Sequence, residues 1–274
     1  MIPSIASRSY RLIEKEGVME FLRTAEDFAL NRIPRLSRAP VVDEVCFRYS
    51  LDRLRRRRRS ETDLDDVLDT AYRYSGAGAY GTIAPLQLRS ELAMVTEYID
   101  DLEPQTVVEI GTMYGGTFYT WARHLDSVET LVSVDVPGGT TPPRFLRRAA
   151  PEKRLEFVRG DSHATATREQ VSEVLNGDDV DVLFVDGDHS LEGVREDWEM
   201  YRGLLADDGV VLFHDIVSIE EDEWTDVDLF WDQLKTNHEV VELVDPDYDP
   251  HDSIEVNGHP IVGHGFGLVL DPRD

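Results

Sequence analysis

Short apolar runs that each end in polar residues recur from residue 107 onward. The first spans residues 107–110, and four more occupy residues 131–134, 155–158, 180–185 and 210–213. Residues 118–125, which follow the first run, have the spacing of a helix. Continuous apolar runs of this length indicate strands buried on both faces, as in parallel sheets covered by helices. The pattern therefore predicts an open α/β fold.

The turn after the first run is rich in glycine. Gly111, Gly115 and Gly116 permit a tight turn and a close approach of the backbone to a ligand. In open parallel sheets, ligands bind at the carboxyl ends of the strands. We therefore expect one site to be built from the polar residues that follow the other runs. These are Asp135, then Asp161 and Ser162, then Asp186, Asp188 and His189, and finally His214 and Asp215.

The order of these motifs resembles that of the class I S-adenosylmethionine-dependent methyltransferases, over roughly residues 85 to 270. The Asp186-Gly187-Asp188-His189 motif together with His214-Asp215 is similar to that of the metal-dependent sugar O-methyltransferases of macrolide biosynthesis. Related proteins with this motif are often labelled cephalosporin hydroxylase. The resemblance implies a doubly wound, mostly parallel sheet of seven strands.

The remaining apolar runs fit this fold. Residues 240–244 and 265–270 would supply the last two strands, one of them antiparallel, after a helix expected at residues 229–236. We expect a methyltransferase domain over residues 85–274. Residues 1–84 would form a helical, basic extension and cover, in which residues 72–85 with their glycines would be a mobile lid.

A methyl donor would use the glycine turn for its methionine part. The turn from Gly111 to Gly116, which includes Gly115 and Tyr114, would wrap this part of the cofactor. Glu109 would reach the ammonium group or order the loop. The alternative for each acidic residue at a strand end is a helix cap or a surface charge.

The ribose and adenine parts would meet the next two strand ends. Asp135 would accept hydrogen bonds from the two ribose hydroxyls, and Asp161 and Ser162 would meet the amino edge of adenine. A nicotinamide cofactor is the main rival. Met113, however, stands where the motif Gly-x-Gly-x-x-Gly has its second glycine, which favours the methyl donor.

Methyl transfer to a hydroxyl requires a base for the hydroxyl proton, and a divalent metal makes the alkoxide accessible. The resemblance implies that Asp186 and Asp215 are metal ligands and that His189 is the base. His214 stands where that family often has an acid, and we take it as the third ligand. Oxygen ligands favour magnesium, whereas an imidazole favours manganese, iron or zinc. We expect magnesium or manganese, with Asp188 either a ligand or the residue that orients His189.

The predicted function is transfer of a methyl group from S-adenosylmethionine to a hydroxyl or carboxyl oxygen of a carbohydrate or glycan. Two alternatives stay open. His189, His214 and Asp215 would form the two-His-one-carboxylate iron site of an oxygenase, or the protein would bind cofactor or glycan without catalysis. A separate alternative for His214 and Asp215 is that they only brace the strand end.

Acceptor walls are expected after the fifth strand and at nearby aromatic residues. Residues 216–226 lie where acceptor loops usually occur, and Trp224, Trp231 and Tyr114 would stack on a sugar ring. Three histidines without ligand spacing are interpreted as ordinary surface or capping residues: His251, His259 and His264.

Charge divides the chain into two parts. Residues 1–59 contain 14 basic and 8 acidic residues, although the whole chain has a formal net charge of −27 and only three lysines. Acid-rich chains with so few lysines are typical of salt-adapted organisms. The arginine run at residues 55–59 indicates either a solvated or ion-paired helix face or contact with an anionic partner such as a lipid-linked sugar. The acidic body disfavours nucleic acid.

The chain has no apolar run of 18 residues, so we expect a cytoplasmic protein. Residues 9–31 have the spacing of an amphipathic helix, which would pack onto the core or make peripheral contact with the inner membrane face. Cys46 is the single cysteine, which excludes an intrachain disulfide. A homo-oligomer is compatible with the sequence.

Overall fold

A computed structural model describes residues 40–138, 141–217, 225–248, 254–256, 259–261 and 264–273, without the side chains of residues 254–256 and 259–261. The helix expected at residues 9–31 lies outside the described residues. So do Trp224, His251, the side chain of His259 and most of the expected acceptor loop at residues 216–226.

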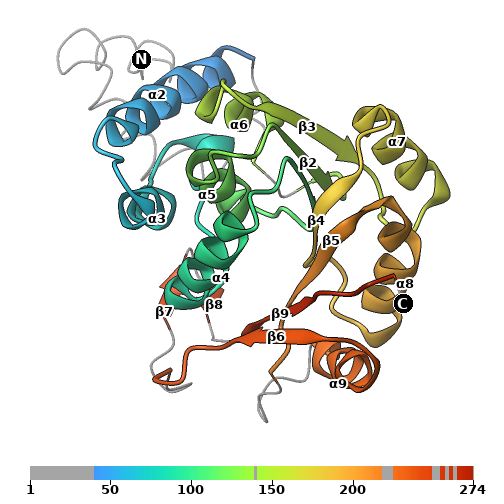
Figure 1. Cartoon of the computed structure of the whole chain (residues 1–274). Coiled ribbons are helices and arrows are strands. Elements are labelled where there is room, and N and C mark those ends of the chain that lie inside the picture. Colours follow the sequence, from blue (N-terminus) through green and yellow to red (C-terminus); the bar gives the residue numbers. More distant parts are fainter. Residues whose placement is uncertain are drawn as a thin grey trace, which may run out of the picture.

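Seven strands form one sheet in the order β3-β2-β1-β4-β5-β9-β6 (Figure 1). Strands β1 to β5 are parallel, β9 is antiparallel to β5, and β6 is antiparallel to β9. This confirms the predicted mostly parallel, seven-stranded sheet with an antiparallel final strand. The strands are β1 (Thr106–Ile110), β2 (Thr130–Asp135), β3 (Arg154–Arg159), β4 (Val180–Val185), β5 (Leu205–His214), β6 (Val240–Leu243) and β9 (Phe266–Val269).

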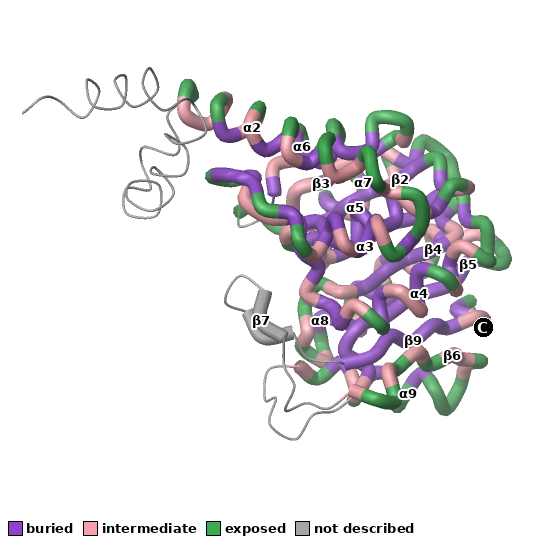
Figure 2. The backbone as a smooth tube through the Cα atoms, turned by 90° about the vertical axis from the view of Figure 1, so that its left-hand side faces the viewer, coloured by how far each residue is buried: buried purple, intermediate pink, exposed green. Residues whose placement is uncertain are grey.

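Helices cover both faces of the sheet (Figure 1). Strand residues alternate between the two faces: Val107 packs into the cluster that includes α4, α5 and α6, and Val108 into the cluster that includes α7, α8 and α9. Figure 2 shows the central strands as buried along their length. The helices are α4 (Arg89–Asp101), α5 (Gly116–His124), α6 (Pro143–Ala149), α7 (Thr165–Leu175), α8 (Leu191–Tyr201) and α9 (Val227–Asn237).

Two further helices, α2 (Pro40–Arg58) and α3 (Leu64–Arg73), extend the first of these faces. Leu54 and Leu68 belong to the same hydrophobic cluster as Trp121 of α5. The arginine run lies at the end of α2, where Arg56 pairs with Asp52 at 2.7 Å and Arg58 reaches Glu152 at 3.4 Å. These helices therefore share one core with the sheet.

The segment expected to be a mobile lid packs into that core. The side chains of Tyr74, Tyr80 and Ile83 are buried, with the short η2 (Gly78–Tyr80) between them. A side chain at Gly116 would collide with the backbone of Pro85. The segment thus forms a wall beside the first turn of α5, with its aromatic rings buried in the core.

Outside the sheet, a hairpin of β7 (Ile254–Val256) and β8 (His259–Ile261) was not predicted from the sequence. Its two strands are only three residues long, which is too short for a periodic signal. Within the described residues, no helix combines the length and the apolar character that a membrane crossing requires.

Candidate active site

The carboxyl ends of the parallel strands open into one cavity of about 980 Å³. The sequence-predicted cofactor residues and the predicted catalytic residues both line it. Gly115 is the exception, because it caps α5 with φ of 83° and faces Leu146 instead. The predicted residues that line the cavity are Glu109, Gly111, Tyr114, Gly116, Asp135, Asp161, Ser162, Asp186, Asp188, His189, His214 and Asp215.

The glycine turn is fixed by its contact with the next strand. Gly111 has φ of 86°, and a side chain there would collide with the carbonyl of Asp186 at the end of β4. The amide of Asp186 donates to Ile110 O at 2.9 Å, and the amide of Gly111 donates to Val134 O at 2.9 Å. Glycine is therefore required for strand packing as well as for approach to a ligand.

Asp135 is tied to the same turn. Its Oδ2 accepts hydrogen bonds from the amides of Thr112 at 3.0 Å and Met113 at 2.9 Å. Arg159 Nη1 lies 3.9 Å from this oxygen. The carboxylate therefore orders the turn while it lines the cavity, and its contact with a ribose stays a prediction.

Glu109 is a buried acid in the wall, with 2% of its surface exposed. Burial raises the pKa of Glu109 well above its usual range, and nearby Asp186 and Asp135 raise it further, against a hydrogen bond with Thr112. Among the described residues, its Oε2 has no hydrogen-bond partner. An ammonium group in the cavity would supply a donor, so this residue fits its predicted role beside the methionine part of the cofactor.

The end of β3 carries the predicted adenine residues and one that the sequence did not reveal. Asp161 is largely exposed, and its Oδ1 accepts from the amide of His163 at 3.0 Å. His163 also lines the cavity, and its Nε2 lies 3.4 Å from Oδ1 of the buried Asp197 on α8. The spacing between residues 163 and 197 gave no signal, because the loop after β3 and helix α8 come together only in the folded chain.

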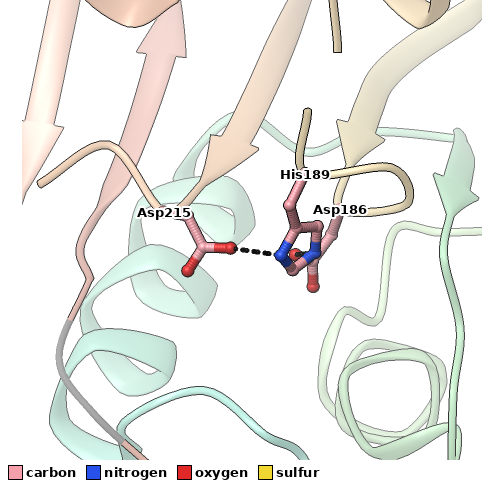
Figure 3. Close-up of side chains that lie close together, drawn as sticks. All are labelled: Asp186, His189 and Asp215. Carbon is pink, nitrogen blue, oxygen red and sulfur yellow. Dashed lines mark ion pairs between the residues drawn. The ribbon is translucent and has the colours of Figure 1, made fainter. Parts of the chain in front are cut away.

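Asp186, His189 and Asp215 point toward one another at the ends of β4 and β5 (Figure 3). His189 Nδ1 lies 3.1 Å from Asp215 Oδ2, and His189 Nε2 lies 3.6 Å from Asp186 Oδ1. One ligand atom from each residue lies within 4.8 Å of the others. Two carboxylates and an imidazole at these distances fit a divalent cation.

His214 borders the same cluster from β5. Its Nδ1 lies 3.0 Å from Asp215 Oδ1 and 3.5 Å from Asp186 Oδ1. Burial acts to lower the pKa of His214, but the two carboxylates outweigh burial and raise the pKa well above its usual range. Asp215, with φ of 63°, shows the reverse balance, because the three histidines around it hold its pKa below the usual range despite burial.

The third histidine is His264, and its interpretation as a surface or capping residue was wrong. The structure leaves 2% of it exposed and places its Nδ1 3.9 Å from Asp215 Oδ1. It precedes β9, where Phe266 pairs with His214 of β5. The antiparallel insertion of β9 beside β5 brings His264 to the site, and ligand spacing in the sequence cannot reveal such a contact.

Asp188 is turned toward the start of α8 rather than toward His189. Its Oδ1 accepts from the amide of Ser190 at 2.9 Å, which is the main reason that its pKa is lowered. A side chain at Gly193 would collide with its carboxylate. Asp188 therefore shapes the loop that carries His189.

Gln87 is a further cavity residue that the sequence did not indicate. Its Nε2 donates to Asp186 Oδ2 at 2.7 Å, and Thr117 Oγ1 donates to its Oε1 at 3.0 Å. Only 6% of Gln87 is exposed. Glutamine carries no motif of its own, so only the fold identifies this contact.

The central part of the chain is similar in sequence to known methyltransferases. Residues 108–216 match the family described as "Methyltransferase domain". The rhamnosyl O-methyltransferase of Mycobacterium tuberculosis is 28% identical over 121 residues, which are 43% of this chain and 48% of that protein. The protein of the same name from Mycobacterium leprae is 26% identical over 121 residues, 43% of this chain and 51% of that one. The match thus spans about half the length of these curated relatives.

Among solved structures, an O-methyltransferase from Bacillus cereus in complex with SAH is similar to this chain. It has 16% sequence identity and a TM-score of 0.45, and the match covers 65% of this chain and 80% of that one.

The match over residues 108–216 runs from β1 to the residues just after β5, and it includes the ends of the five parallel strands that line the cavity. This part of the chain is similar to methyltransferase domains.

Proposed function

We propose that this protein transfers the methyl group of S-adenosylmethionine to a hydroxyl oxygen of a carbohydrate, with a divalent cation assisting. The observation that carries the proposal is the shared cavity, which is lined both by the glycine turn with Asp135 and by Asp186, His189 and Asp215. A methyl donor and an acceptor that are both bound in this cavity would be close enough for the methyl group to pass directly from one to the other. Direct transfer depends on such proximity.

The charge of the cavity favours a cationic cofactor. Its described lining contains no lysine or arginine. Besides Glu109, whose pKa is raised by burial, and His214, whose pKa is raised by its carboxylate neighbours, it contains five aspartates: Asp135, Asp161, Asp186, Asp188 and Asp215. The sulfonium and the ammonium group of S-adenosylmethionine are both positive. The pyrophosphate of a nicotinamide cofactor is negative and would be repelled. This supports the methyl donor over its main rival.

The transfer itself requires one bond exchange and one proton acceptor. The acceptor oxygen forms a bond to the methyl carbon while the carbon–sulfur bond breaks and its electron pair stays on sulfur. The proton of the acceptor hydroxyl goes to His189 Nε2. Asp215 Oδ2 lies 3.1 Å from Nδ1 and Asp186 Oδ1 lies 3.6 Å from Nε2, so the two carboxylates would stabilise the imidazolium that forms.

Asp186 and Asp215 would hold the cation, with an imidazole as a third ligand. A bound divalent cation would lower the pKa of an acceptor hydroxyl. If His214 is the nitrogen ligand, His189 is left as the base. The grouping of Asp186, His189 and Asp215 favours His189 as the nitrogen ligand. His214, which also lies beside Asp186, would then not be needed as a ligand. The two assignments predict different effects of His189→Ala: a lower rate of transfer with unchanged cation binding if His189 is the base, or a loss of cation binding if it is the ligand.

A carbohydrate acceptor is supported by the relatives rather than by the cavity. The two mycobacterial proteins that match residues of this domain carry the name rhamnosyl O-methyltransferase. Trp231 was expected to stack on a sugar ring, but it is fully buried in the core and cannot reach an acceptor. Tyr114 remains at the cavity wall for that role.

Calorimetric titration with S-adenosylmethionine, S-adenosylhomocysteine and NAD tests the proposal. We expect the two adenosyl sulfur compounds to bind and NAD not to bind, with and without manganese. Asp135→Ala should weaken adenosylhomocysteine binding by about tenfold or more, because the ribose loses its acceptor and the turn loses two hydrogen bonds. NAD binding alone would overturn the proposal. Cofactor binding without transfer to any of a panel of rhamnosides and other sugars would favour a non-catalytic binding protein.

A further inference from the structure

The side chain of Gln87 lies between the cofactor turn and the proposed cation site. Thr117, in the first turn of α5, donates its hydroxyl to Gln87 Oε1 at 3.0 Å. On the other side, Gln87 Nε2 donates to Asp186 Oδ2 at 2.7 Å. Tyr72 Oη also donates to the carbonyl of Gln87 at 2.6 Å. The glutamine is therefore held at its backbone and at both ends of its amide.

The charge of Asp186 sets the orientation of this amide. An ionised carboxylate only accepts hydrogen bonds, so the NH₂ group must face Asp186 and the carbonyl oxygen must face Thr117. The three groups are almost completely removed from water, since Gln87, Thr117 and the side chain of Asp186 are 6%, 4% and 11% exposed. Water is therefore a poor substitute for any of these contacts.

The amide leaves the two oxygens of Asp186 with different surroundings. Oδ2 receives the short hydrogen bond from Gln87, whereas Oδ1 faces His189 at 3.6 Å and His214 at 3.5 Å. Only Oδ1 is thus turned toward the group of side chains that fits a cation.

We infer that Gln87 is a positioning residue that reserves a single oxygen of Asp186 for the cation and thereby favours small cations over calcium. This inference rests on the cation in the proposed function. Magnesium and manganese take about six ligands in octahedral geometry, whereas calcium takes 6–8 oxygens and often binds a carboxylate through both of them. An Asp186 that is restricted to one oxygen suits the smaller ions.

Gln87→Met removes both amide contacts at nearly constant volume. We expect the manganese Kd, measured from the free Mn²⁺ signal in electron paramagnetic resonance, to rise about tenfold, as for other partners of metal ligands. Calcium, measured by its competition with manganese, should lose less affinity because Asp186 can then offer both oxygens. The ratio of manganese to calcium affinity should fall by about fivefold or more.

Gln170→Met, at an exposed position of α7, is the matched control and should change neither affinity. Thr117→Val provides a second variant, because it keeps Gln87 but removes the hydroxyl that orients its amide. It should shift the ratio in the same direction by a smaller factor. The thermal unfolding temperature and the affinity for S-adenosylhomocysteine of each variant are measured as well. Both should equal those of the wild type, because a purely structural defect would alter them.

An unchanged ratio of manganese to calcium affinity in both variants would overturn the inference. So would a wild-type protein that binds adenosylhomocysteine but neither cation. Both outcomes leave methyl transfer standing as a proposal, whereas failure to bind any adenosyl compound removes the proposed function itself.

Discussion

At the scale of single residues, the neighbourhood of the site contains a buried acid to which the proposed reaction gives no role. Asp197 of α8 is fully buried beside His163, and burial raises the pKa of Asp197 to about 6 from its ordinary 3.8. Asp188 and Asp161 raise it further, while Ser162 and His163 act in the opposite direction. The folded protein therefore prefers the protonated carboxyl, and ionisation of Asp197 reduces stability.

Asp197→Asn should consequently stabilise the protein at high pH. The contribution of the protonated acid is complete below pH 3.8 and is lost as the pH rises through about 6. At pH 8 the free energy of unfolding of the variant should therefore exceed that of the wild type by up to about 3 kcal/mol. The gain is smaller to the extent that ionised Asp197 is stabilised by its contact with His163. Urea unfolding at pH 5, 6, 7 and 8 measures the difference, which should grow with pH. A difference that is independent of pH would contradict this view of Asp197.

At the scale of elements, the sequence predicts what depends on local pattern. The five parallel strands and their acidic ends were predicted because buried strands are apolar throughout and because parallel strands end at one edge of the sheet. Gln87, His264 and Asp197 were not, because their contacts join segments that are distant in the sequence. The same holds for the packing of residues 72–85, where glycines suggested mobility but buried tyrosines decide the structure.

One such contact fixes the element that carries His264. Glu91, at the start of α4, is fully buried and accepts from the amides of Gly265 at 3.1 Å and Asp245 at 3.2 Å. It therefore ties the segment after β6 and the segment before β9 to one helix. The position of His264 beside Asp215 depends on this attachment.

Glu91→Gln should loosen that attachment without removing a group from the cavity. A glutamine offers one acceptor oxygen in place of two, so one buried amide is left unpaired, at a cost of about 1–3 kcal/mol. Urea unfolding measures the loss, and hydrogen exchange should show faster exchange at Gly265 than in the wild type. Glu97→Gln, on the exposed side of the same helix, is the control and should change neither quantity. Equal exchange at Gly265 in all three proteins would show that Glu91 does not hold this segment.

At the scale of the whole molecule, the formal net charge of −27 acts against compactness. Many acidic groups have basic partners in the described part, such as Asp65 and Asp69 with Arg89, or Glu61 with Arg123. With 55 acidic and 28 basic residues, however, about half of the carboxylates have no basic residue of their own to pair with. Their mutual repulsion acts over a Debye length of about 10 Å at 0.1 M salt and about 3 Å at 1 M.

Salt should therefore stabilise this protein strongly. We expect the unfolding temperature to rise by more than about 5 °C between ~0.1 M and ~2 M KCl, which for a domain of this size corresponds to about 2 kcal/mol. Potassium chloride is preferred to sulfate, because sulfate also strengthens the burial of apolar groups. If screening is the cause, most of the rise should occur below ~1 M, where the Debye length changes most. An equal rise in sucrose at matched osmolality would attribute the effect to solvent exclusion, and a flat profile would mean that the acidic surface does not limit stability.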